Sequence, residues 1–98
     1  MIKVIIKEKE LTISGHAGFA DYGKDIVCAS VSSMVVACAN DMFTVKEKAI
    51  SYTDDGNTVI IKLLEEDELV IKLLNNLKEL LKGLAKDYPE NIKIESEE

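Results

Sequence analysis

Two short segments near the start of the chain alternate between apolar and polar residues with a period of two. Ile2, Val4 and Ile6 share one face of the first segment, and Leu11 and Ile13 alternate with Thr12 and Ser14 in the second. A period of two is typical of half-buried strands, because successive side chains of a strand point to opposite sides. The pattern therefore predicts strands over residues 2–7 and 11–14.

The next apolar stretch, from Ile26 to about Val45, follows a different pattern. Its apolar residues fall on nearly every side of a helix, which is typical of a helix that is buried on most sides. Asp25 comes directly before it and is a good N-cap residue, because its carboxylate can accept from the first backbone N–H groups. We therefore predict a buried helix over 26–45.

The second half of the chain predicts two further strands, a helix and a last strand. The strands cover 49–53 and 58–64, and the Asp55-Gly56 dipeptide between them is typical of a hairpin turn. Leucines at helical spacing then predict an amphipathic helix: Leu69, Leu73, Leu77, Leu80, Leu81 and Leu84. Ile92 and Ile94 indicate a short final strand, after which 95–98 should be a frayed acidic tail.

The order of elements is thus ββαββαβ. With 98 residues and no linker, internal repeat or low-complexity segment, we expect residues 1–98 to form a single α+β domain. Its sheet should be mainly antiparallel, with two helices. The sequence pattern leaves the strand order open.

Residues 15–24 have no apolar periodicity and contain three glycines, so they form a predicted loop. Little in this segment can hold one conformation, and we expect it to be poorly ordered in the protein without substrate.

The net charge of −6 indicates which classes of macromolecule the protein can bind. It argues against direct binding to nucleic acid, which needs clustered Lys and Arg, and suits a basic protein instead. The start of the chain has too many lysines for a signal peptide, and no apolar run approaches the length that crosses a bilayer. We therefore expect a cytoplasmic protein that does not bind a membrane.

The two cysteines, Cys28 and Cys38, fall on the same predicted helix. Ten helical residues separate them by about 15 Å, too far for a disulfide. With a single histidine and no C-x-x-C pair, a structural metal site is not expected either. Cys38, in the middle of the helix among apolar residues, is interpreted as a buried structural thiol.

Cys28 occupies a different position, because it is the third residue of the predicted helix. There the unpaired backbone N–H groups and the positive end of the helix dipole favour a thiolate, which is the reactive form of cysteine. His16, at the end of a strand and beside Gly15, is the candidate acid–base partner. A Cys–His pair within hydrogen-bond reach is the minimal arrangement for acyl transfer.

Two neighbours of this pair each have two interpretations. Asp25 is either only the helix cap or a third catalytic residue that orients the imidazole of His16. Ser32 lies one turn after Cys28, where its hydroxyl either bonds the Cys28 carbonyl or tunes the thiol. Gly15 is a candidate supporting residue beside His16.

At these positions the chain resembles the ribosomal-processing cysteine proteases. The residues that carry the resemblance are Gly15-His16-Ala17 and the run Asp21-Tyr22-Gly23-Lys24-Asp25-Ile26-Val27-Cys28-Ala29-Ser30-Val31-Ser32. The size, the acidic character and the order of elements agree over the whole chain.

The resemblance implies a cysteine endopeptidase that removes the N-terminal extension of a large-subunit ribosomal protein. It assigns Cys28 as nucleophile and His16 as general acid and base, with no metal or organic cofactor. It also implies a homodimer and a mobile loop that covers the substrate: Ala17, Gly18, Phe19, Ala20, Asp21, Tyr22, Gly23 and Lys24.

Two other functions are compatible with the residues alone. One is a non-enzymatic dimeric ribosome-assembly or adaptor module in which Cys28 is merely buried. The other is a redox switch that forms a reversible disulfide between chains or with a small thiol.

Overall fold

The computed structural model describes residues 1–15 and 26–98, and its elements follow the expected order ββαββαβ. A short 3₁₀ turn, Glu47–Ala49, precedes the third strand. The helices and strands are β1 (Ile2–Ile6), β2 (Glu10–Ser14), α1 (Ile26–Val45), β3 (Ile50–Asp54), β4 (Thr58–Leu63), α2 (Glu68–Asp87) and β5 (Ile92–Ser96).

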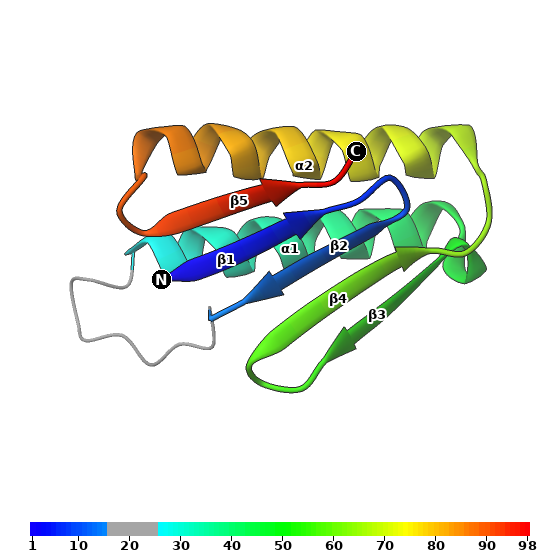
Figure 1. Cartoon of the computed structure of the whole chain (residues 1–98). Helices are drawn as coiled ribbons and strands as arrows, with labels where there is room; N and C mark the ends of the chain where they lie inside the picture. The colour runs from blue at the N-terminus through cyan, green and yellow to red at the C-terminus, as the bar shows by residue number, and fades with distance from the viewer. Residues whose placement is uncertain (16–25) are drawn as a thin grey trace.

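The strands form one five-stranded sheet in the order β3-β4-β2-β1-β5. The pairs β1–β2, β2–β4 and β3–β4 are antiparallel, and β5 joins the outer side of β1 in parallel. The prediction of a mainly antiparallel sheet with two helices is confirmed. Both helices lie on the same face of this sheet, so the fold has two layers (Figure 1).

The core lies between the sheet and the helices and follows the period of two. The buried strand residues are Ile2, Val4, Ile6, Leu11, Ile13, Ile50, Val59, Ile61 and Ile92. The opposite face of the sheet carries charged side chains, some of them in cross-strand ion pairs such as Lys3–Glu95 at 3.5 Å and Lys62–Glu10 at 3.9 Å. Exposed pairs of this kind add little stability, but they keep the open face polar.

The β3–β4 hairpin turns where the Asp-Gly signal predicts. Gly56 has a φ of +90°, a conformation that glycine adopts without strain. The Asp55 carboxylate accepts from the backbone N–H groups of Asn57 and Thr58, at 2.9 and 2.7 Å. These hydrogen bonds hold the pKa of Asp55 below its usual value.

Helix α2 begins at a cap that the leucine pattern did not locate. The Asp67 carboxylate accepts from the N–H groups of Leu69 and Val70, both at 3.0 Å. The buried stripe of the helix consists of Val70, Leu74, Leu77, Lys78 and Leu81. The predicted stripe was wrong at Leu69 and Leu80, which are exposed, because these two leucines lie beside the buried stripe and not on it.

Helix α1 is buried along one side only. Val27, Val31, Val35, Ala39 and Met42 face the core, whereas Ile26 and Val36 remain 66% and 58% exposed. The expectation of burial on most sides was therefore wrong. One sheet face and one neighbouring helix cannot cover the whole circumference of α1.

The expectation that no apolar segment could cross a membrane was also wrong for α1. By length and composition alone, α1 is the one helix in the described part of the chain that could do so. Core helices of soluble proteins meet the same criterion, and α1 packs its buried side into the core described above.

The acidic end of the chain is not frayed, contrary to the prediction from its composition. Glu95 and Ser96 belong to β5, and the Glu97 N–H donates to the Ile6 carbonyl at 2.7 Å. The Glu98 carboxylate lies 3.0 Å from the Lys78 ammonium. Tertiary contacts that the local sequence does not reveal therefore order this segment.

Candidate active site

Cys28 is the third residue of α1, as predicted. Val27 and Val31 beside it are buried, at 7% and 0% exposure, and anchor the first turns of the helix in the core. Cys28 itself is half-buried and packs against the edge of that core. Its sulfur therefore belongs to a rigid element yet stands close to solvent.

The electrostatics of this helix end favour a thiolate. The first N–H groups of a helix have no acceptor within the helix, and the dipole places partial positive charge there. The first turn of α1 contains no acidic residue that would oppose this effect. A cysteine in this position is suited to nucleophilic attack on a carbonyl carbon.

Cys38 has the opposite surroundings, ten residues further along the same helix. Burial raises the pKa of its thiol, and the nearby Asp41 carboxylate raises it further. The thiol is therefore protonated at neutral pH, and the interpretation of Cys38 as a structural thiol fits its half-buried position against the core. Both cysteines are thiols, with no disulfide between them.

Gly15 directly follows β2 in a conformation that requires glycine. Its φ is +79°, and a Cβ at this position would lie 2.5 Å from the carbonyl oxygen of Met1. Its N–H donates to the Asn57 carbonyl at 3.1 Å. The backbone of Gly15 is thus held between the start of β1 and the β3–β4 hairpin.

Cys28 and Gly15 lie at the same end of the molecule. Figure 1 shows that α1 begins at the end where β1 begins and β2 ends. The fold therefore brings the helix start that carries Cys28 to the same end as Gly15, the residue before His16.

Several predicted site residues lie outside the described residues: His16, Asp25 and the loop Ala17–Lys24. The pairing of Cys28 with His16, the two roles considered for Asp25 and the order of the loop stay predictions. Ser32 is half-buried one turn after Cys28, as expected from its spacing. Within 1–15 and 26–98, no group of three or more His, Cys, Asp or Glu side chains could hold a metal ion.

One buried polar residue escaped the sequence analysis. Lys78 is only 2% exposed and donates hydrogen bonds to the carbonyl groups of Lys7 and Glu8. Its position between Leu74, Leu77 and Leu81 on the helical stripe was the available signal, because a charge on an apolar stripe needs buried partners.

Comparison with known proteins identifies the family of this chain. The sequence model of the cysteine protease Prp family matches residues 1–93 of this chain. The ribosomal processing cysteine protease Prp of Mycoplasma pneumoniae is 34% identical over 97 residues, which cover 99% of this chain and 96% of the relative.

Two solved structures of the ribosomal processing protease Prp from Staphylococcus aureus have the same fold. The complex with a substrate peptide has a TM-score of 0.88 at 23% identity. The complex with a covalently linked product peptide has a TM-score of 0.84 at 25% identity. Each match covers 99% of this chain and 100% of the other. On the strength of the family match and of the relative from Mycoplasma, this chain belongs to the cysteine protease Prp family.

Proposed function

We propose that this member of the family removes the N-terminal extension of a large-subunit ribosomal protein, with Cys28 as nucleophile and His16 as general acid and base. The observation that carries the proposal is the position of Cys28. It is a half-buried thiol in the first turn of α1, in a chain that the family description matches over residues 1–93.

The proposed reaction has two halves. The Cys28 thiolate attacks the scissile carbonyl, and backbone N–H groups at the start of α1 stabilise the oxyanion. The C–N bond then breaks, a proton passes from His16 to the leaving amine, and an acyl-enzyme remains. A water molecule then gives a proton to His16 and attacks the thioester. The C–S bond breaks, the new carboxylic acid leaves and loses its proton to solvent, and the Cys28 thiolate and the protonated His16 are restored.

The charge of the enzyme supports a basic substrate. With a net charge of −6, the protein attracts a basic polypeptide over distances comparable to the Debye length. A ribosomal protein precursor is such a polypeptide, and the cytoplasm, where it is made, is the compartment in which we propose that the enzyme acts.

The test is incubation of the enzyme with the precursor ribosomal protein from the same organism. Mass spectrometry of the product should give one new N-terminus downstream of the extension, and the mature protein should remain uncut. An intact precursor after prolonged incubation with reduced enzyme would reject this substrate.

Two substitutions distinguish the role of Asp25 as a helix cap from its role as a catalytic residue. A cap needs an acceptor oxygen, which Asn supplies, whereas orientation of a cationic imidazole needs the charge. We expect Asp25→Asn to keep most of the stability and a substantial share of kcat. Asp25→Ala should lose about 0.5–2 kcal/mol of unfolding free energy, together with activity.

Thermal unfolding and turnover on one peptide are to be measured for both variants. If Asp25→Asn folds normally but cleaves no faster than a variant without the nucleophile, Asp25 is a catalytic residue rather than only a cap.

We also propose that the enzyme works as a homodimer through the open side of α1. Val36 projects from this side and borders a hollow of about 240 Å³, whose walls are Val36, Ala39, Asn40, Phe43 and Tyr52. A two-fold interface uses the same patch on both subunits, so it needs a protruding group and a recess together. This patch has both, and pairing would bury the apolar surface that one protomer leaves exposed.

Substitution of Val36 tests this interface. Val36→Lys should convert a dimer into a monomer in sedimentation at micromolar concentration, because two buried ammonium groups would face each other across the axis. Leu64→Lys is the matched control, since Leu64 is 59% exposed against 58% for Val36 but lies after β4. A wild-type monomer, or a dimer that Val36→Lys leaves intact, would contradict the proposal.

A further inference from the structure

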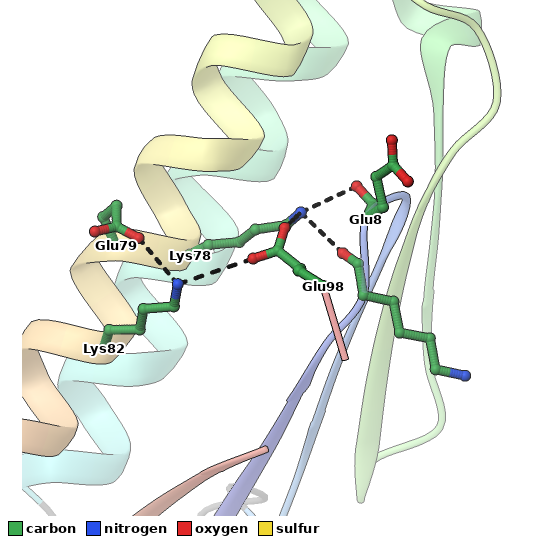
Figure 2. Close-up of polar contacts among 6 residues, drawn as sticks. Glu8, Lys78, Glu79, Lys82 and Glu98 are labelled. Atoms are coloured by element: carbon green, nitrogen blue, oxygen red, sulfur yellow. Dashed lines mark hydrogen bonds and ion pairs between the residues drawn. The ribbon is translucent and has the colours of Figure 1, made fainter. Parts of the chain in front are cut away.

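The buried lysine of α2 has a complete set of partners. A charged ammonium in a protein interior is unfavourable unless each of its N–H donors is bonded. The Lys78 Nζ donates to the carbonyl oxygens of Lys7 and Glu8, at 2.8 and 3.0 Å, and to Glu98 Oε2 at 3.0 Å. An ammonium has three donors, so all of them are used (Figure 2).

Lys78 and its partners come from three separate segments. Lys78 lies on α2, the two carbonyl groups belong to the turn between β1 and β2, and Glu98 follows β5. The parallel pairing of β5 with β1 aligns Ser96 with Ile6, and the Glu97 N–H continues the ladder to the Ile6 carbonyl. The sheet thus delivers the Glu98 carboxylate to the ammonium.

The two ammonium groups that contact Glu98 favour its ionised form. From α2, Lys78 contacts it and Lys82 Nζ lies 3.8 Å from its Oε1, while Glu79 lies on the far side of Lys82, at 3.2 Å. From the turn, the Glu8 carboxylate points away from the cluster (Figure 2). The hydrogen bond from Lys78, and then the charges of Lys78 and Lys82, lower the pKa of Glu98 although its partial burial opposes this.

The two members of the pair differ in exposure, and this difference decides which one can leave. The Lys78 side chain is 3% exposed and is fixed by the helix, whereas the Glu98 side chain is 35% exposed at the end of an edge strand. When the Glu98 carboxylate moves away from Lys78, water can take its place at the ammonium. The hydrogen bonds from Lys78 to the carbonyl groups of Lys7 and Glu8 remain. Opening at this point does not require the core to separate.

We propose that Lys78 and Glu98 form an electrostatic latch that holds residues 97–98 against α2 and the β1–β2 turn, and that opens when Glu98 loses its charge while the rest of the domain stays folded. The latch lies at the end of β1 opposite the candidate active site and is independent of the proposed function. It accounts for the order of the acidic end of the chain.

The direction of the pH effect follows from the lowered pKa. A carboxylate whose pKa is lower in the folded state stabilises that state above its ordinary pKa, and this contribution is lost as the pH falls through the lowered value. The latch should therefore be closed at neutral pH and open in acid, below the ordinary range for glutamate.

Glu98→Gln in the full chain tests the latch, because the amide keeps the shape and loses the charge. At pH 7 the exchange rate of the Glu97 amide should rise by about tenfold or more, while the amides of β2 and β4 keep their protection. In the wild type the same local loss should appear on acidification, measured as protection relative to the intrinsic exchange rate. Glu98→Gln should lack this pH step.

Matched variants separate the latch from unrelated effects on the same amide. Glu79→Gln removes a carboxylate from Lys82 but not from Lys78, so the Glu97 amide should exchange as in the wild type. Lys78→Met leaves two carbonyl groups unpaired, and we expect it to unfold at a lower urea concentration. Glu98→Gln is therefore the variant that tests the latch. The latch is rejected if Glu98→Gln changes Glu97 exchange less than about twofold, if protection falls equally throughout the sheet, or if the pH step persists without the carboxylate.

Discussion

Replacement of Cys28 by alanine should abolish peptide cleavage, whereas Cys38→Ser should cleave at close to the wild-type rate. Loss of the nucleophile of a two-residue catalytic unit typically lowers kcat by at least about 10⁴-fold. The two thiols lie on one helix, so the contrast arises from their surroundings alone. Cys28 faces the positive end of α1, while burial and Asp41 raise the pKa of Cys38.

The comparison needs both turnover and stability. We expect Cys28→Ala to unfold at nearly the wild-type temperature, because the side chain is only half-buried. Cys38→Ser places a hydroxyl against the core and should lose about 1 kcal/mol of unfolding free energy. Both variants are to be assayed for kcat/KM on one peptide that spans the cut, below their melting temperatures.

Alkylation at neutral pH gives an independent measure of the same difference. A thiol-specific reagent should modify Cys28 first, and activity should fall in proportion to that modification. If Cys38 reacted first, or if Cys28→Ala remained active, the helix-start argument would be wrong. Slow alkylation of Cys28 with no cleavage of the precursor would instead favour a non-enzymatic adaptor.

Gly15→Ala should impair both stability and catalysis. The position has a φ of +79°, which costs an alanine about 1–2 kcal/mol, and the new Cβ would stand 2.5 Å from the Met1 carbonyl oxygen. The Met1 oxygen is a backbone atom and the Cβ is fixed directly to the backbone of residue 15, so the backbone after β2 or at Met1 must shift. Because His16 follows directly, a displacement of about 1 Å would lower kcat/KM by about 100-fold beyond the effect of unfolding.

Gly56 and Gly83 are controls that separate the conformational strain at Gly15 from the contact with Met1. Gly56 has a φ of +90° but open space where a Cβ would stand, so Gly56→Ala measures the conformational strain alone. Gly83 lies within α2 with no such strain or contact, and Gly83→Ala should stabilise the protein by about 0.5–1 kcal/mol. Chemical unfolding and kcat/KM are to be measured for all three variants. Equal activity in Gly15→Ala and Gly56→Ala would show that the contact with Met1 has no part in positioning the site.

The sequence by itself determined the elements and the special position of Cys28, because both depend on near neighbours in the chain. The period of two in Ile2, Val4 and Ile6 requires a strand with one buried face, whatever covers that face. The helix that begins at Ile26 places Cys28 in its first turn by spacing alone. These features are local, and a single sequence contains them.

The tertiary structure decided everything that depends on segments far apart in the chain. The strand order places β5 beside β1, and only this pairing brings Glu98 to Lys78, so the frayed tail expected from composition is ordered instead. Likewise, Gly15 requires glycine because the Met1 backbone occupies the space of a Cβ.

The errors on the helices have the same physical origin. Apolar spacing shows which residues of a helix can be buried. Which face is actually buried depends on the elements that pack against the helix. On α2 the sheet and α1 cover Val70 and Leu74 and leave Leu69 and Leu80 outside. On α1 they leave Val36 exposed. Burial is a property of the packed layers, and the free energy of removing apolar surface from water is gained only where a second layer is present to cover it.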